Sequence, residues 1–367
     1  MKTIQEIYCK LCAVGFLTLL LACGGSDKDV DNPQPMGDGS CATELSNLES
    51  SIRSTLNNLN RDTDFTLLIA ADDGKRFEHS VGNSSADTSY RSASTSKFVT
   101  SAVLLSLVFN DEFFLSDQPQ DYIPAWPTNG NLSDITLAHL LSFTSGLNEE
   151  ALCIDLPNAD PSSCGYSILT NNLSNLKIAG EEFYYSSSHM QIAGLMAINA
   201  LEANSWQEVF NLFRTRTGLF TNSFYDLPSL TNPRLAGGMH WTANDYLDFL
   251  KAIYEQTILT PELIIQMTSD QLTDSIIVNS PAIIRINEDW HYGFGNWIEC
   301  HSDSFNCSQV SKVSSPGAYG AYPFIDFTNN YYGILAREGK LGTFSNGYEA
   351  FAMVEDQLKL WAGMSCR

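Results

Sequence analysis

A long apolar run directly after a serine and a lysine constrains the fold of this chain more than any other segment. The residues Ser-Thr-Ser-Lys at 94–97 are followed by F-V-T-S-A-V-L-L at 98–105. A helix that is apolar on nearly every side is a buried helix, so we expect the core to form around this one. If the helix begins near Ser94, the three-residue spacing places the ammonium of Lys97 on the same face as the Ser94 hydroxyl.

Ser94 and Lys97 together have the properties of a nucleophilic site. A serine hydroxyl is a weak nucleophile until a neighbour takes its proton. The unpaired N–H groups at a helix N-terminus also favour a developing negative charge. The S-x-x-K spacing is common, however, and a serine N-cap beside a solvated lysine is the alternative interpretation.

The N-terminal residues are typical of an exported protein. The apolar run at 11–22 is shorter than the about 20 residues that cross a bilayer, as in a secretory signal peptide. It ends in L-L-A-C-G at 20–24, which resembles a bacterial lipobox with Cys23 as the lipidated residue. An ordinary cleaved signal with an incidental cysteine is the alternative. We expect residues 1–22 to be a lipoprotein signal peptide.

The expected location is therefore the bacterial envelope, with the chain anchored in a membrane through a lipid on Cys23. Gly24 follows instead of the aspartate that often retains such proteins in the inner membrane, so the outer membrane is favoured. Residues 23–40, built mainly from small polar residues and proline, are expected to form a flexible tether. Residues 41–367 form the expected folded body, either one large domain or two closely packed subdomains.

Six cysteines follow Cys23, and an even number in an exported chain suggests disulfides. Proximity in the sequence pairs Cys153 with Cys164 and Cys300 with Cys307. The remaining pair, Cys41 and Cys366, would then join the two ends of the folded body. A zinc site is the alternative, but the spacings lack the C-x-x-C pairs and nearby paired histidines of such sites.

The charge of the chain limits its partners. Lys and Arg number 20 against 42 Asp and Glu, which gives a net charge of −22. Such a surface repels phosphate backbones, so nucleic acid is not an expected partner. We expect no cofactor either, because the sequence contains neither a phosphate-binding loop nor a cluster of metal ligands.

Strand-like segments gather near both ends of the folded body. Residues 65–70 and 76–81 read as a hairpin, and 331–336 as a late strand. The middle reads as mostly helical, including a short helix within 135–147 that has Thr136 as its N-cap and Gly146 as its terminator. Helices are also expected at 45–59 and, as a closing amphipathic helix, at 348–361.

Several segments, in this order, resemble motifs of the class C-like branch of the serine β-lactamase and penicillin-binding-protein superfamily. Residues 90–102 resemble F-R-x-x-S-x-[ST]-K-x-x-T-[AS], and 135–147 resemble I-T-x-x-x-L-L-[ST]-H-T-S-G-L with Phe143 in place of histidine. Residues 179–187 resemble P-G-x-x-F-x-Y-S-N, with Ala179 in place of proline and Ser187 in place of asparagine. Residues 235–245 are similar to A-G-G-x-x-[ST]-T-A-x-D, and residues 291–297 resemble Y-G-[LF]-G-x-W.

The resemblance implies an α/β (α+β) fold of the β-lactamase/transpeptidase type. Its antiparallel sheet comes from both chain ends and is flanked by helices, with a mostly helical subdomain inserted. It also implies acyl transfer, in which Ser94 attacks a carbonyl and Lys97 acts as base or electrostatic activator. Tyr185 is implied as a proton shuttle, on the argument that the neighbouring cation favours its phenolate. The backbone N–H groups of Ser94 and Ala318 are the implied oxyanion hole.

The substrate-binding positions implied by the resemblance are Ser187, Ser315 and Gly317. Ser315-Pro316-Gly317 stands where the family has K-T-G or H-x-G, so the cation that grips the carboxylate of a β-lactam is missing. We therefore expect an exported serine hydrolase of the esterase or amidase type, acting on a small or peptide-like substrate. A β-lactamase or D-Ala-D-Ala carboxypeptidase is the first alternative. A non-catalytic binder or sensor that retains the fold is the second.

Overall fold

The computed structural model describes residues 38–174, 177–299 and 312–366. The expected signal peptide, the lipidation site Cys23, most of the tether and the Cys300–Cys307 pair lie outside these residues. The first helix, α1 (Asp38–Asn57), begins within the segment expected to be a tether. None of the helices in the described ranges combines the length and the apolarity needed to cross a membrane.

An antiparallel sheet of seven strands unites the two ends of the described chain, in the order β2-β1-β12-β11-β10-β9-β8. The early strands, β1 (Phe65–Ala71) and β2 (Arg76–Val81), form the expected hairpin. β1 also pairs along its whole length with β12 (Tyr331–Arg337), from Phe65 opposite Arg337 to Ala71 opposite Tyr331. The other late strands are β8 (His291–Tyr292), β9 (Trp297–Glu299), β10 (Lys312–Ser314) and β11 (Tyr322–Asp326).

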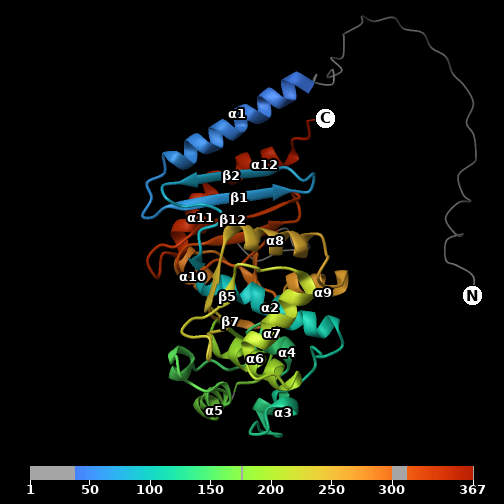
Figure 1. Cartoon of the computed structure of the whole chain (residues 1–367). Coiled ribbons are helices and arrows are strands. Elements are labelled where there is room, and N and C mark those ends of the chain that lie inside the picture. The colour runs from blue at the N-terminus through green and yellow to red at the C-terminus, as the bar shows by residue number, and fades with distance from the viewer. Residues whose placement is uncertain (1–37, 175–176, 300–311, 367) are drawn as a thin grey trace, which may run out of the picture. The chain divides into compact units, whose positions relative to one another are not determined.

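Helices cover both faces of this sheet (Figure 1). Tyr332 of β12 packs on Tyr254 of α8 (Ala243–Tyr254). Its neighbour Tyr331 packs on Phe324, which in turn contacts Phe351 of α11 (Phe344–Ala352). Because successive strand residues point to opposite faces, α8 and α11 lie on opposite sides of the sheet.

The closing helix expected at 348–361 is two helices, so that prediction was wrong in part. α11 ends at Ala352 and α12 (Glu355–Gly363) begins after Val354. On one continuous helix, Phe351 and Trp361 would lie about 80° apart around the axis. The break lets Phe351 pack on the sheet at Phe324 while Trp361 packs on Phe77 of β2.

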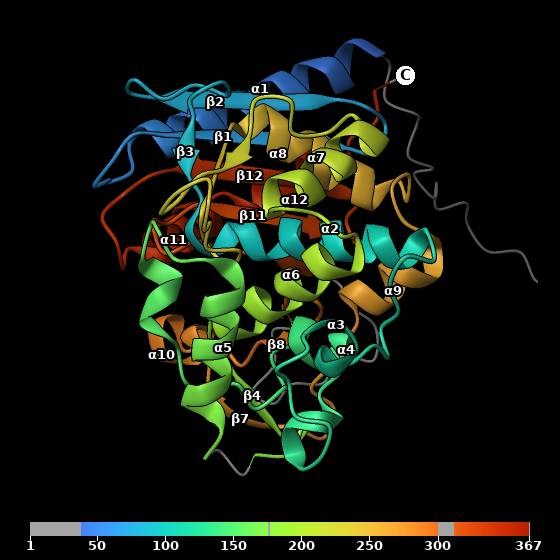
Figure 2. The ribbon, with the colours of Figure 1, turned by 60° about the horizontal axis from the view of Figure 1, so that its bottom comes forward.

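The segment between the two halves of the sheet is mostly helical, as expected. α2 (Ser96–Phe109) is buried from Ser96 to Leu107 and crosses between the sheet and α6 (Ser188–Ala200), as Figure 2 shows. The remaining helices of this part are α3 (Pro119–Tyr122), α4 (Leu137–Leu141), α5 (Pro161–Asn172), α7 (Trp206–Thr217), α9 (Pro261–Thr268) and α10 (Pro281–Ile286). Short 3₁₀ turns lie at η1 (Ala93–Thr95), η2 (Asn131–Asp134) and η3 (Leu152–Asp155).

Two small sheets position loops around α2. One has the order β3-β6-β5 and consists of Tyr90–Arg91, Met239–Trp241 and Phe224–Tyr225; the other pairs β4 (Glu182–Tyr184) in parallel with β7 (Ile276–Asn279). In α4, the predicted N-cap is confirmed, because Thr136 Oγ1 accepts the N–H of His139. The helix ends at Leu141 and not near Gly146, because Phe143 adopts a left-handed φ of 61°.

Disulfides join Cys41 to Cys366 and Cys153 to Cys164, which confirms both of these predicted pairs. The first links α1 to the segment after α12, and the two helices lie side by side in Figure 1. Trp361 Nε1 of α12 donates to Glu49 Oε1 of α1 at 3.0 Å. The ends of the described chain are therefore held together covalently and by packing.

Candidate active site

Ser94 lies on the 3₁₀ turn that leads into α2, two residues before the helix begins. The preceding residue, Ala93, has a left-handed φ of 45°, a conformation that residues with a Cβ rarely adopt. Neighbouring segments hold the turn in place. Trp241 Nε1 donates to Thr95 Oγ1 at 2.7 Å, and Tyr246 Oη donates to the Thr95 carbonyl at 2.9 Å.

The ammonium of Lys97 is directed at the Ser94 hydroxyl. Lys97 Nζ lies 3.0 Å from Ser94 Oγ and 2.8 Å from the carbonyl oxygen of Ala236. The residue is only 4% exposed, so the alternative of a solvated lysine is excluded. Burial lowers the pKa of Lys97 to about 7; the Glu150 carboxylate acts to raise that pKa and the Arg234 guanidinium to lower it. A lysine with such a pKa is neutral in a substantial fraction of molecules near pH 7.

Tyr185 completes the group around Ser94. Its phenol is hydrogen-bonded to the Ser94 side chain, and Lys97 Nζ lies 4.6 Å from the centre of its ring. The ring stacks on Trp297 at a centroid distance of 5.3 Å. Burial raises the pKa of Tyr185, and the hydrogen bond from Ser94 offsets this only in part. The phenol therefore stays protonated, and the expected stabilisation of a phenolate by the cation was wrong.

Beneath Tyr185 lies a buried histidine that the motif did not include. His189 Nδ1 shares a hydrogen bond with Ser145 Oγ at 2.7 Å, and Nε2 bonds the carbonyl of Tyr184 at 2.9 Å. Its ring stacks on Phe143 at 4.9 Å. Burial lowers the pKa of His189 to about 4, so the ring is neutral near pH 7. This histidine supports the loop that carries Tyr185.

The segment Ser315-Pro316-Gly317 follows β10 and lies against the nucleophile turn. Ser315 Oγ donates to the carbonyl of Ser94 at 3.3 Å. A Cβ on Gly317 would lie 2.5 Å from the Ser92 carbonyl oxygen, so only glycine fits there. Ala318 follows in a turn closed by the hydrogen bond from Gly320 N–H to the Gly317 carbonyl, at 2.8 Å. Both segments expected to supply the oxyanion hole are thus adjacent.

Ser187 lies at the start of α6, and its backbone N–H donates to Glu150 Oε1. Next to it, Ser186 Oγ donates to the Leu147 carbonyl at 2.9 Å, which fixes the segment that carries Glu150. Glu150 was not predicted from the sequence, because it belongs to no matched motif. The Ala236 carbonyl was also missed, since a backbone acceptor has no signature of its own in a sequence.

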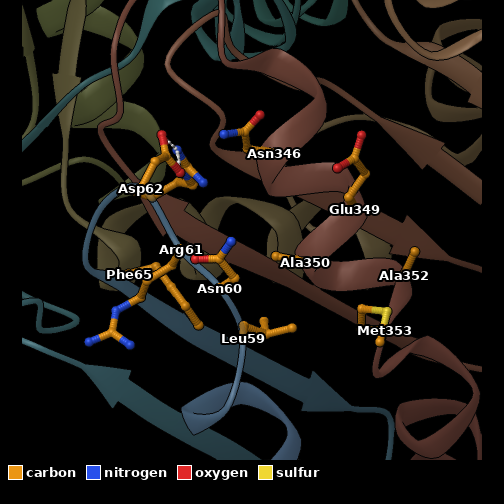
Figure 3. Close-up of a pocket in the computed structure, with 11 residues that line it drawn as sticks. Leu59, Asn60, Arg61, Asp62, Phe65, Asn346, Glu349, Ala350, Ala352 and Met353 are labelled. Atoms are coloured by element: carbon orange, nitrogen blue, oxygen red, sulfur yellow. Dashed lines mark hydrogen bonds and ion pairs between the residues drawn. The ribbon is translucent and has the colours of Figure 1, made fainter.

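The described residues contain no group of three or more His, Cys, Asp or Glu side chains that could hold a metal ion. A cavity of about 550 Å³ lies elsewhere, between the loop after α1 and α11 (Figure 3). It is lined by residues such as Leu59, Asp62, Arg337 and Met353 and by none of the predicted site residues. The candidate site is therefore the surface around Ser94, which α2, α6 and the segment after β10 bring together.

The sequence matches the family model described as Beta-lactamase over residues 65–344. No curated protein sequence matches the chain. Among solved structures, it is similar to a candidate beta-lactamase from Bacteroides dorei, with 26% identity and a TM-score of 0.67 over 86% of this chain and 98% of that one.

Two further structures share the fold at lower identity. One is EstCE1, a hydrolase with promiscuous acyltransferase activity, at 18% identity and a TM-score of 0.64 over 89% of this chain and 99% of that one. The other is the D-amino acid amidase of Ochrobactrum anthropi, at 14% identity and a TM-score of 0.65 over 85% and 99% of the two chains.

Proposed function

This chain belongs to the beta-lactamase family, and on that premise we propose that it is an exported serine hydrolase. It cleaves an ester or amide bond through an acyl-enzyme on Ser94. The observation that carries the proposal is the contact of 3.0 Å between Lys97 Nζ and Ser94 Oγ in a site where the pKa of Lys97 falls to about 7. A buried amine with this pKa is matched to proton transfer near neutral pH.

In the proposed acylation, neutral Lys97 takes the proton of Ser94 Oγ while that oxygen bonds to the substrate carbonyl carbon. The carbonyl oxygen becomes an oxyanion between the backbone N–H groups of Ser94 and Ala318. As the tetrahedral intermediate collapses, the bond to the leaving alcohol or amine breaks. Protonated Tyr185, bonded to Ser94, passes a proton to that group and regains one from Lys97.

Hydrolysis of the ester on Ser94 follows the same path in reverse. Water takes the position of the leaving group, gives a proton to Lys97 and bonds to the acyl carbon. The bond to Ser94 Oγ then breaks, and the proton returns to this oxygen. Ser94 and Lys97 are thereby restored, and the products are a carboxylic acid and an alcohol or amine.

The absence of a cation at Ser315 supports an ester or amide substrate over a β-lactam or a D-Ala-D-Ala peptide. Ser315 is buried and donates to backbone carbonyls of Ser94 and Gly295, and a hydroxyl cannot form an ion pair with a carboxylate. The activities named for EstCE1 and for the D-amino acid amidase fall within the proposed class. For location, we propose lipid attachment at Cys23; the two disulfides are compatible with an exported chain.

The test is a time course with purified chain and its Ser94→Ala variant. Short-chain nitrophenyl esters and a chromogenic cephalosporin are offered in parallel, and the intact mass is read at each point. We expect turnover of the esters, a transient acyl adduct on Ser94, and neither in Ser94→Ala. Rapid cephalosporin turnover would instead support the β-lactamase alternative. An acyl adduct that forms once and is never released would support the sensor.

A further inference from the structure

We propose that Glu150 selects substrates that carry a positive charge next to the scissile carbonyl, such as the α-ammonium of an aminoacyl ester or amide. This inference rests on the hydrolase function proposed above, because it names the substrate class of the same site. It adds a recognition residue that lies outside every motif by which the chain resembles its family.

The position of Glu150 is fixed relative to the nucleophile by the backbone around it. Its Oε1 accepts the N–H of Ser187, two residues beyond Tyr185, whose phenol bonds to Ser94. The hydrogen bond of 2.9 Å from Ser186 Oγ to the Leu147 carbonyl holds the same two segments together a few residues earlier. The carboxylate is thereby placed beside the start of α6, at the motif position where a substrate contact is expected.

The negative charge of Glu150 influences the pKa values of the groups around Ser94. It acts to raise the pKa of Lys97 and also that of Tyr185, and it acts in the same direction on buried His189. Coulomb interactions weaken with distance and with solvent exposure, and the hydrogen bond to the Ser187 N–H holds the Glu150 carboxylate on the segment that carries Tyr185 and His189. A substrate held at Ser94 is exposed to the same negative charge.

The other charges near the site do not cancel this one. Arg234 also influences Lys97, but its guanidinium forms an ion pair with Asp155. Ser315 brings no cation. Among the residues that the structure describes, no ion pair joins Glu150 to a basic side chain, and Glu150 is exposed to solvent. The rim of the site therefore offers a carboxylate that a cationic substrate can reach.

An ionised carboxylate has room for more than the single N–H that Oε1 accepts here. An ammonium is its natural partner, because hydrogen bonds between charged groups are about twice as strong as neutral ones. The same charge repels a substrate carboxylate, which is consistent with the missing cation at Ser315. Glu150 therefore favours a cationic substrate in two ways: it attracts an ammonium and it repels a carboxylate.

The test compares substrates that differ only in the ammonium. D- and L-alanine p-nitroanilide carry it, whereas propionic acid p-nitroanilide has the same skeleton without it. We expect a kcat/KM preference of about 10- to 100-fold for one alanine enantiomer over the propionyl compound. In Glu150→Gln the ratio of the kcat/KM values for the alanine and propionyl compounds should fall to near one, mainly through a higher KM for the alanine compound.

Glu149→Gln is the matched control, because Glu149 is a neighbouring exposed carboxylate whose hydrogen bonds to Ser188 Oγ and to the Asn172 side chain use only its main-chain atoms. It should keep the wild-type preference. The preference of wild-type enzyme should also fall as the pH rises above the pKa of the substrate ammonium, about 8. A second measurement, calorimetric binding of alaninamide and propionamide to Ser94→Ala, should favour alaninamide.

Hydrolysis of all three anilides without preference, or an unchanged preference in Glu150→Gln, would overturn the inference while leaving the hydrolase intact. Equal binding of the two amides to Ser94→Ala would overturn it as well. If neither anilides nor nitrophenyl esters are hydrolysed and Ser94 is never acylated, the proposed function itself fails, and the assignment of Glu150 fails with it.

Discussion

Lys97 Nζ donates to Ser94 Oγ at 3.0 Å, and neither this acceptor nor its second acceptor, the Ala236 carbonyl, carries a formal charge. Another buried lysine of the chain shows the opposite arrangement. Lys312 lies 2.8 Å from Glu299 and 2.9 Å from Glu355, and the two carboxylates raise its pKa. One fold therefore holds one lysine that gives up its proton readily and one that keeps it.

We expect kcat/KM for a neutral ester to depend on pH through Lys97. Lys97 must be neutral to accept the Ser94 proton, and its pKa is about 7. The rate should therefore rise about tenfold per pH unit below pH 7 and level off above it. A profile measured from pH 5 to 9 in constant ionic strength tests this, and a flat profile would contradict it. Lys97→Arg should lose about a thousandfold at pH 8 and should show no rise near pH 7, because arginine does not release its proton.

Tyr185→Phe should lower kcat by about 100- to 1000-fold and leave KM nearly unchanged. The phenol oxygen bonds to Ser94, whereas the ring stacks on Trp297 and contacts Phe143. The variant keeps these ring contacts, so its thermal unfolding midpoint should stay within a few degrees of the wild type. A kcat within threefold of the wild-type value would remove Tyr185 from the mechanism.

Gly317→Ala should abolish activity, because its Cβ would lie 2.5 Å from the Ser92 carbonyl oxygen beside the nucleophile. Gly237→Ala is a matched control, since its nearest contact, the Ala93 carbonyl carbon, lies at 3.4 Å. We expect at least a hundredfold loss of ester hydrolysis in the first variant and less than a tenfold loss in the second. Similar losses in both variants would show that the close approach of Gly317 to the Ser92 carbonyl does not explain the loss of activity.

Lys312→Met should lower the free energy of unfolding by about 3 kcal/mol or more, because it removes the ammonium that lies 2.8 Å from buried Glu299. Lys359 contacts the same Glu355 at 3.2 Å from a side chain that is 34% exposed. Lys359→Met should therefore cost less than about 1 kcal/mol. Urea unfolding of both variants measures the difference, and equal losses would argue against the role of burial.

Replacing both Cys41 and Cys366 with serine should destabilise the protein by about 5 kcal/mol, since this disulfide closes a loop with a sequence separation of 325. The Cys153–Cys164 disulfide, with a separation of 11, should contribute about 3 kcal/mol or less. Urea unfolding of the two double variants provides the comparison. The order of the two losses would be reversed if closure of the long loop contributed little.

Local patterns predicted much of the fold and the central pair of the site. The hairpin at 65–81, the strand at 331–336 and the buried helix after Ser94 follow from periodicity and apolar runs. Tyr185 followed from its motif. Each of these predictions depends on residues that are close together in the sequence.

Features set by tertiary contacts could not be read in the same way. Burial decides the pKa of Tyr185, and no local pattern reports the depth at which a phenol lies. The break before α12 depends on two contacts with the sheet, because Phe351 packs on Phe324 and Trp361 packs on Phe77. The place of Glu150 in the site could not be predicted, because it depends on a tertiary hydrogen bond from the Ser187 N–H at the start of α6.

The pairing of β1 with β12 has a consequence for the order in which the protein can be completed during synthesis. The ribosome makes β1 early and β12 near the end, so one edge of β1 stays unpaired until then, on a strand whose side chains are apolar except for Thr66. Such an edge invites pairing with other chains. Ser315 and Gly317 belong to the same late segment, so a nascent chain already contains Ser94 but has no finished site around it. The site around Ser94 is therefore completed only when the last strands of the sheet have emerged.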